Sequence, residues 1–372
     1  MLKTIFLFYP SFENGGATKN LINIVNFILK KNIKIILISK NAKKNNFIFS
    51  KNLKIINSKP LRIFNFLPIR WNLALSSMID LNSSIKLHSK NSIIFSMQSH
   101  IPAIIIAKLN KIKIILRNSE EPIGATIYAD NKILGFLVLI LKFIFYNFAD
   151  KIIAISKRSA TSLKKIVISN KKINLIYNPY LTKISKFNKI IKKDKKKFVI
   201  LSVGRFTNQK NLFPLINVFS NLSKKYYNIE LKLVGSGSQR KEIEIKTKHL
   251  NNVKIINWQK DIKNIFLKAD LFVLNSFYEG LPNVLIDAVN YEIPCISTDV
   301  SGARDILLNG NGGYILPIND SNKLRKKIEF VINNYSDSKK KVRIAKKSIR
   351  RFSEINLVLF LKTFLKLANH KN

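Results

Sequence analysis

The chain has 372 residues, of which 47% are hydrophobic, and this is enough for two globular domains with separate cores. Its one cysteine, Cys295, excludes an internal disulfide and is typical of a reducing compartment. The formal net charge is +44, and 54 of the 65 basic residues are lysine. This charge predicts attraction to an anionic membrane surface, or it reflects A/T-rich codons, which favour Lys, Asn and Ile. The lysines are spread along the chain without a zinc-finger or aromatic-basic pattern, which disfavours nucleic acid as a partner.

The first ten residues, MLKTIFLFYP, combine a basic residue with an apolar run, as a signal peptide does. The run is short, it ends at Pro10, and no small-residue cleavage site follows it. We therefore expect a β-strand at this position.

Short apolar runs alternate with longer helical stretches along the whole chain. This alternation predicts an α/β protein with parallel sheets covered on both faces. The strands expected are Thr4–Phe8, Ile33–Ile38, Ser92–Phe95, Ile112–Leu116, Lys151–Ile155, Ile173–Tyr177, Phe198–Val203, Glu230–Val234, Val253–Ile256, Leu271–Leu274 and Cys295–Ser297.

A lysine-rich segment without Gly or Pro, Leu181–Lys197, separates two strand-rich halves and is a candidate linker. We expect an N-terminal domain over residues 1–181, a basic linker over 182–197 and a C-terminal domain over 198–352. The last helix, within residues 353–372, is too apolar to stand alone, and the N-terminal domain is one surface on which it could pack.

The most membrane-like stretch is Ile133–Ala149, ILGFLVLILKFIFYNFA. Its length is near the lower limit for a transmembrane helix, and Lys142 at its middle would cost about 3 kcal/mol in a bilayer. We therefore expect a buried or interfacial helix, with Lys142 and its neighbours towards lipid headgroups.

The strand predicted over Phe198–Val203 leads into Gly204, Arg205 and then Lys210, at the start of a helix. Two cations beside the positive end of a helix favour an anionic ligand, and an Arg fork with a mobile Lys suits a diphosphate. Ordinary surface charge is the alternative. In the first half, Gly15 and Gly16 likewise lie between a strand and a helix, where a plain turn or a phosphate contact is expected.

Two further turns bear on the ligand. Gly235 and Gly237 occupy the first two positions of a GxGxxG pattern, but the third is Arg240, so we do not expect NAD. In LFVLNSFYEGLPNVLIDAVN, a buried strand ends before Glu279, and Pro282 opens a helix that carries Asp287. Amides at this helix start can hold phosphate oxygens and the carboxylates can accept bonds from sugar hydroxyls, although Glu279 could instead be a helix cap.

In these segments the chain resembles the retaining glycosyltransferase family 4, with its GT-B fold of two Rossmann-like domains whose parallel sheets face a central cleft. The segments that carry the resemblance are GGATKN, ADKIIAIS, LIYNP, SVGRFTNQKN, LVGSGS, WQKDI, SFYEGLPNVLIDA and STDVSGARDILLNGNGGYILPIND. They follow the family's order and cover most of the chain. The resemblance implies an N-terminal acceptor-binding domain and a C-terminal donor-binding domain.

The resemblance also implies roles for individual residues. Arg205 and Lys210 would neutralise the donor diphosphate, Glu279 would contact the donor sugar, and Asp287 would hold the ribose, where the family usually has Glu. The other implied donor-binding positions are Gly16, Gly204, Gly280, Leu281, Pro282 and Asn283.

Two N-terminal residues complete the set. His100 matches a histidine that lies near the transferred sugar in many family members, with a core histidine as the alternative. Arg117 ends a predicted strand and could contact acceptor or phosphate, or could pair with Glu120 or Glu121.

No metal-ligand cluster and no Asp-x-Asp are present in the sequence, so we expect no metal and no cofactor besides the nucleotide sugar as co-substrate. The resemblance implies a metal-independent, retaining hexosyltransferase that uses a UDP-hexose or UDP-N-acetylhexosamine, with GDP-mannose still open. We expect a lipid-linked glycan acceptor in bacterial surface polysaccharide or glycoconjugate synthesis, and a cytoplasmic enzyme held peripherally at the inner face of the plasma membrane. The alternative is a catalytically silent protein that binds sugar nucleotides or serves as a scaffold at the membrane.

Overall fold

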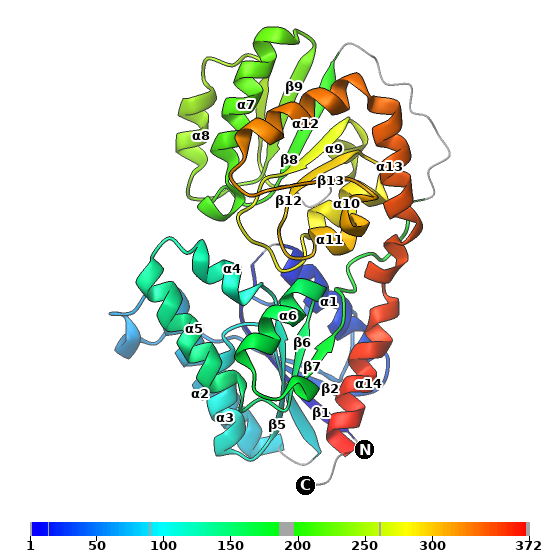
Figure 1. Ribbon diagram of the computed structural model, residues 1–372. Coiled ribbons are helices and arrows are strands. Elements are labelled where there is room, and N and C mark those ends of the chain that lie inside the picture. The colour runs from blue at the N-terminus through cyan, green and yellow to red at the C-terminus, as the bar shows by residue number, and fades with distance from the viewer. Residues whose placement is uncertain (1, 14, 89–90, 186–196, 260–261, 370–372) are drawn as a thin grey trace. The chain divides into compact units, whose positions relative to one another are not determined.

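The computed structural model describes residues 2–13, 15–88, 91–185, 197–259 and 262–369. The chain forms two compact units (Figure 1). Unit 1 comprises Met1–Thr126, Asn131–Thr182 and Phe352–Asn372, and unit 2 comprises Ile127–Asp130 and Lys183–Arg351. Most of the expected linker, residues 186–196, lies outside the described residues.

Unit 1 contains a seven-stranded sheet in the order β3-β2-β1-β4-β5-β6-β7, with every neighbouring pair parallel. Its strands are β1 (Thr4–Ser11), β2 (Lys34–Lys40), β3 (Leu53–Ile56), β4 (Ser92–Ser96), β5 (Lys113–Asn118), β6 (Lys151–Ala154) and β7 (Ile173–Leu175). Its helices are α1 (Gly16–Leu29), α2 (Ile69–His88), α3 (His100–Leu109), α4 (Pro122–Ile127), α5 (Lys132–Tyr146), α6 (Lys157–Ile166) and α14 (Ile355–Asn369).

Both faces of this sheet are buried, as the continuous apolar runs predict. Along β1, Ile5 and Leu7 enter one core, whereas Phe6 and Phe8 enter the other, because successive side chains of a strand point to opposite faces. The N-terminal segment is therefore a β-strand, as the sequence predicts, and it lies in the interior of the sheet between β2 and β4.

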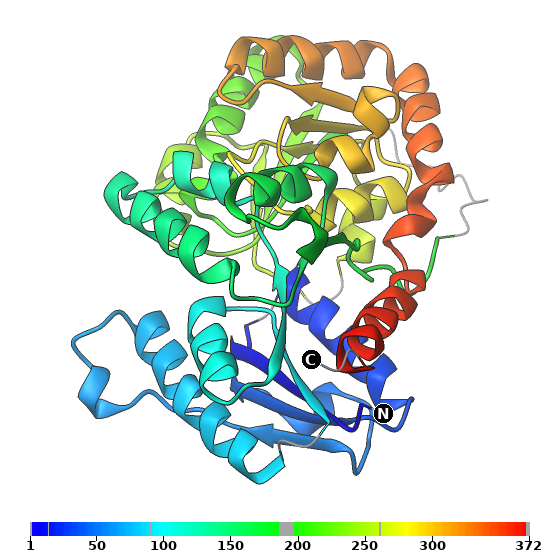
Figure 2. The same ribbon diagram turned by 60° about the horizontal axis from the view of Figure 1, so that its bottom comes forward.

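The last helix of the chain, α14, completes the core of unit 1. Phe360 and Phe364 contact the Phe95 ring of β4, with centroids 6.0 and 4.9 Å apart. In Figures 1 and 2, α14 (red) lies beside α1 (blue), which it also contacts. The chain thus returns from unit 2 to cover one face of the first sheet.

Unit 2 has a six-stranded parallel sheet in the order β10-β9-β8-β11-β12-β13. Its strands are β8 (Phe198–Val203), β9 (Ile229–Val234), β10 (Val253–Ile256), β11 (Leu271–Leu274), β12 (Cys295–Thr298) and β13 (Tyr314–Leu316). Its helices are α7 (Leu212–Lys225), α8 (Arg240–Thr247), α9 (Lys263–Leu267), α10 (Asn283–Asn290), α11 (Ala303–Ile306), α12 (Ser321–Asn333) and α13 (Tyr335–Lys347).

In each sheet there is one point at which the order of successive strands across the sheet changes direction. In unit 1 the order reverses between β1 and β4, and in unit 2 between β8 and β11. At such a point the loops after adjacent strands diverge, and the crevice at the carboxyl ends of the strands is the usual ligand site of open parallel sheets. The segments after β1, β4, β8 and β11 are those that carry Gly16, His100, Arg205 and Glu279.

Among the described residues, no helix has the length and hydrophobicity of a membrane-spanning segment.

Candidate active site

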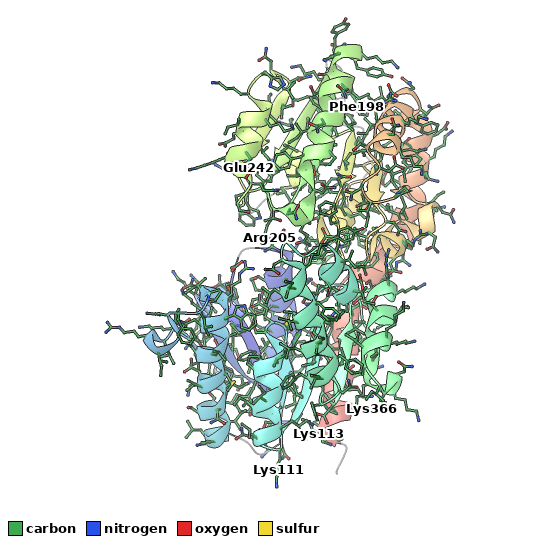
Figure 3. All side chains as sticks on the ribbon, turned by 60° about the vertical axis from the view of Figure 1, so that its left-hand side comes forward. Lys111, Lys113, Phe198, Arg205, Glu242 and Lys366 are labelled. Carbon is green, nitrogen blue, oxygen red and sulfur yellow. The ribbon has the colours of Figure 1, made fainter. Side chains whose placement is uncertain are left out.

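The loop after β8 presents the two predicted phosphate-binding cations. Arg205 is exposed, and Figure 3 shows it at the opposite end of the β8 segment from Phe198. Lys210 ends a short 3-10 helix, η4 (Asn208–Lys210), just before α7. Both line a small pocket within unit 2, with Gly204, Asn275 and Ser276 among the other lining residues.

Gly204 provides the space in which the Lys210 side chain lies. A β-carbon built on Gly204 would come within 3.0 Å of the Lys210 Cε and 3.3 Å of its Cδ. The absence of a side chain at Gly204 therefore lets the lysine stem follow the backbone into the pocket.

Lys210 forms an ion pair with Glu279, which follows β11. The Lys210 Nζ donates to Glu279 Oε1, and the Ser276 Oγ donates to the same oxygen over 2.8 Å. Both charged side chains are largely buried. A buried pair of this kind is costly to leave incomplete, so each partner fixes the position of the other.

Hydrogen bonds tie the loop after β8 to the loop after β11, and the sequence analysis did not identify the residues that make them. The Gln209 Nε2 donates to the Tyr278 carbonyl over 2.9 Å, and the Phe277 amide donates to the Gln209 carbonyl over 2.8 Å. The Asn275 Nδ2 donates to the Asn211 carbonyl over 2.8 Å. These hydrogen bonds fix the two loops relative to each other, and with them the positions of Lys210 and Glu279.

The helix after Glu279 begins one residue later than expected, because Pro282 is the N-cap of α10 and Asn283 its first residue. Gly280 and Leu281 are buried between Glu279 and this helix, and Asp287 is buried on its second turn. The turn at Gly302 packs against this segment: its φ is +80°, and a β-carbon there would lie 2.9 Å from the Leu281 Cα.

The glycines of the LVGSGS segment have a structural role. A β-carbon on Gly235 would lie 1.8 Å from the Gly204 carbonyl oxygen, and one on Gly237 would lie 2.3 Å from that of Phe206. The Gly204 amide donates to the Val234 carbonyl over 3.0 Å. This turn therefore packs against the loop after β8 and supports it.

In unit 1, Gly16 is the first residue of α1, directly after Gly15 as N-cap. A β-carbon on Gly15 would meet no atom within 4 Å, but its φ of +159° is one that side chains rarely adopt, so the backbone rather than packing favours glycine there.

His100 begins α3 and is partly exposed. Its Nδ1 lies 2.8 Å from the Ser96 Oγ, and that hydroxyl donates its proton to the Gln98 carbonyl over 3.1 Å. The Nδ1 therefore carries the proton, and the Nε2 is left as an acceptor. Desolvation, followed by the positive charges of Lys142 and Arg117, lowers the pKa of His100 to about 3, so the ring is neutral at physiological pH.

Arg117 is the penultimate residue of β5 and is buried, with 1% of its surface exposed. The Arg117 guanidinium donates to Ser119 Oγ over 2.7 Å and to Asn178 Oδ1, and its Nε has no hydrogen-bond partner. The alternative ion pairs are not formed, because Glu120 pairs with Lys142 and Glu121 accepts the amides of its own turn at Ile123 and Gly124. Burial lowers the pKa of Arg117 to about 10, which still leaves it charged at neutral pH.

The expectation that Lys142 points towards lipid headgroups is wrong. Lys142 is only 8% exposed, and its Nζ forms an ion pair with Glu120 on the inner side of α5. A tertiary partner, distant in sequence, determines which side of the helix the lysine occupies.

Residues 183–351 match the family model described as "Glycosyl transferases group 1". The chain is 26% identical to the Campylobacter jejuni "GalNAc-alpha-(1->4)-GalNAc-alpha-(1->3)-diNAcBac-PP-undecaprenol alpha-1,4-N-acetyl-D-galactosaminyltransferase" over 357 residues, which is 95% of each chain. It is 30% identical to the Escherichia coli "UDP-Gal:alpha-D-GlcNAc-diphosphoundecaprenol alpha-1,3-galactosyltransferase" over 183 residues, 46% of each chain.

Among solved structures, the chain is similar to Anabaena HepE in complex with UDP-glucose. The TM-score is 0.77, the identity is 17%, and the match covers 98% of this chain and 99% of the other. This similarity confirms the predicted fold class, two Rossmann-like units with parallel sheets. Together, these matches show that residues 183–351 have the sequence of a group 1 glycosyltransferase domain and that the chain has the GT-B fold.

Proposed function

We propose that this chain transfers a hexose or an N-acetylhexosamine from a UDP-linked donor to a lipid-linked glycan, with retention of the anomeric configuration. The observation that carries the proposal is the pairing of Lys210 with Glu279 in unit 2, beside Arg205 in the same pocket. This pocket is lined by two cations, one of which pairs with a carboxylate that accepts hydrogen bonds, and a sugar diphosphate requires both kinds of group.

The ion pair leaves both partners with capacity for a donor. An ammonium group has three N–H donors, so Lys210 can keep one on Glu279 and direct the others to phosphate oxygens. Both described contacts of Glu279 are made through Oε1, so Oε2 can accept hydrogen bonds from sugar hydroxyls.

Departure of UDP places negative charge on the diphosphate. We propose that Arg205, Lys210 and the amides at the start of α10 stabilise this charge without a metal ion, as positioned dipoles and cations do. Gly280, Leu281, Pro282 and Asn283 would present those amides, and Asp287 would accept the ribose hydroxyls.

Unit 1 would supply the acceptor-side groups. The Nε2 of His100 can accept a hydrogen bond from a hydroxyl, and the buried cation of Arg117 suits a phosphate or an acidic acceptor group. Gly16 would let the start of α1 approach the donor phosphates. The names of the C. jejuni and E. coli relatives, which contain diphosphoundecaprenol-linked glycans, support a lipid-linked acceptor and a place in glycan assembly at a membrane.

Transfer is tested by incubating the full chain with radiolabelled UDP-GalNAc, UDP-GlcNAc, UDP-Gal or UDP-Glc and a mixture of diphosphoundecaprenol-linked glycans. We expect label in the lipid phase with one donor class, undiminished by EDTA, and α-linked product from the α-linked donor. Glu279→Gln keeps the shape of the side chain but loses its charge, and we expect about a 100-fold slower transfer. UDP binding without transfer or donor hydrolysis would favour the catalytically silent alternative.

A further inference from the structure

Helix α5 exposes an unusually large number of apolar side chains. Leu139, Phe145 and Tyr146 pack into the core, and Lys142 is on the same inner side, but most of the other large apolar side chains face outwards. Ile133 is 76% exposed and Phe143 50%, and the other exposed apolar residues of the helix are Leu134, Phe136, Leu137, Ile140 and Ile144. These positions recur every three or four residues and form one stripe along a helix about 22 Å long.

The stripe continues beyond the end of the helix. Phe148 is exposed directly after α5, and Ile168, 82% exposed, follows α6. The Ile168 amide donates to Asn147 Oδ1 over 2.8 Å, so the two connections lie together. The outward face of α5, with Phe148 and Ile168, therefore forms a continuous apolar patch on unit 1.

Basic residues border this apolar patch. Residues 131–180 contain nine Lys or Arg and one acidic residue, Asp150. The Lys172 ammonium donates to the Asn147 carbonyl over 2.6 Å, which places one cation at the end of α5. Helix α6, which contacts α5, carries exposed Lys157, Arg158, Lys164 and Lys165.

An apolar stripe beside cations fits an anionic lipid surface, since acyl chains cover the stripe and headgroups neutralise the charge. A second copy of the chain on the same patch would bring two sets of like charges together.

We propose that α5 lies in the plane of an anionic bilayer, with its outward face inserted at the boundary between headgroups and acyl chains. The inner side of the same helix holds Glu120 through Lys142, and the Tyr146 ring contacts the His100 ring with centroids 5.7 Å apart. Insertion would therefore hold the acceptor-side histidine beneath the membrane surface, where a lipid-linked glycan is presented. The insertion of α5 does not depend on the proposed function, whereas the identity of the acceptor rests on it.

The chain is well suited to a site-specific probe of insertion. Its one cysteine, Cys295, is fully buried, so a cysteine introduced at Phe143 can be labelled selectively with an environment-sensitive fluorophore. The matched control is Ile245→Cys on α8 of unit 2, where the native side chain is 75% exposed. With vesicles of phosphatidylglycerol and phosphatidylcholine, we expect a blue-shifted emission at 143 that acyl-chain nitroxides quench, and a water-like emission at 245.

Two results would overturn the inference. One is a water-like emission at 143 while the protein is bound to vesicles, which would mean adhesion by charge alone. The other is a blue shift at 143 without vesicles that grows with protein concentration, which would mean that a second copy covers the face.

A double substitution, Phe136→Glu with Phe143→Glu, tests the same face without a label. Both side chains are exposed, so we expect normal folding and UDP binding but vesicle partitioning reduced on the order of tenfold or more. Ile245→Glu should partition as the wild-type chain does. UDP binding with unchanged partitioning of the double variant would contradict the role of α5 alone, whereas normal insertion without UDP binding would contradict the proposed function alone.

Discussion

Lys210 illustrates how a neighbour without a side chain can determine where a charge is held. Its stem lies against Gly204, and its ammonium reaches Glu279 from a different part of the sheet. The position of the ammonium therefore depends on contacts at both ends of the lysine side chain.

Gly204→Ala should weaken donor binding without unfolding the protein. The added methyl group lies 3.0 Å from Lys210 Cε, which is closer than normal packing, so the lysine has to shift away from the pocket. We expect a loss of about 1 kcal/mol, or roughly fivefold in the Kd for UDP, measured by calorimetry. An unchanged Kd would show that the position of the Lys210 stem does not matter for donor binding.

His100 should make the stability of the protein depend on pH in a defined window. Its folded pKa of about 3 lies below the ordinary value of 6.5, so below pH 6.5 the unfolded chain takes up a proton that the folded chain does not. The free energy of unfolding should therefore fall as the pH drops, by up to about 2 kcal/mol between pH 6.5 and 5. His100→Asn removes the titration, and its stability should fall less over this window. Parallel stability curves for the two proteins would contradict the low pKa.

Two substitutions of His100 distinguish a catalytic role of this residue from a structural one. Asn can replace the Nδ1 donor to Ser96, whereas Gln places an oxygen near the position of Nε2. If Nε2 accepts a bond from the substrate, His100→Gln should retain at least about tenfold more activity than His100→Asn. Equal activity of the two variants would assign His100 to packing.

At the scale of elements, the loop after β8 depends on the turn at Gly235 that packs against it. A methyl group at Gly235 would lie 1.8 Å from the Gly204 carbonyl, and neither backbone can move without breaking the bond between Gly204 and Val234. Gly235→Ala should destabilise the protein by about 3 kcal/mol, as measured by denaturant unfolding. Ser236→Ala in the same turn is the control, because the Ser236 side chain is exposed, and its stability should be nearly unchanged.

Eleven of the thirteen strands in the described residues were predicted, because long Ile/Val/Leu runs covered on both faces leave a clear signal. The two that were missed, β3 and β13, are strands of four and three residues that each lie at one edge of a sheet. Short edge strands of this kind form because a neighbouring strand is already in place.

The tertiary partners of the site residues could not be predicted from sequence. Lys142 meets Glu120 across 22 positions, and Arg117 meets Asn178 across 61. Which side of α5 faces the core is decided by such contacts, and hydrophobicity alone favoured the wrong side for Lys142. Likewise, Gln209 and Asn275 carry no pattern in the sequence, yet their amides join the two loops of the candidate site.

At the scale of the whole molecule, the same strand topology occurs in both sheets. In each unit the strand order reverses beside the first strand, and the residues assigned to the site follow the strands at that point. The charge of the chain is a separate property: at +44, adhesion to acidic lipid is expected even where no apolar side chain inserts. Salt should therefore weaken vesicle binding, while the part that persists at high salt should depend on the outward face of α5.

The central claim is that unit 2 binds the donor diphosphate through Arg205 and Lys210. The most direct measurement is the stabilisation of the purified chain against unfolding by millimolar UDP, for the wild type, Arg205→Ala and Arg325→Ala. Arg325 on α12 pairs with Glu329 and has no place in the site, so its variant controls for loss of a positive charge. We predict stabilisation of the wild type and of Arg325→Ala, and a Kd about 10- to 100-fold weaker in Arg205→Ala. Equal stabilisation of all three proteins, or none of the wild type, would contradict the assignment of the donor site.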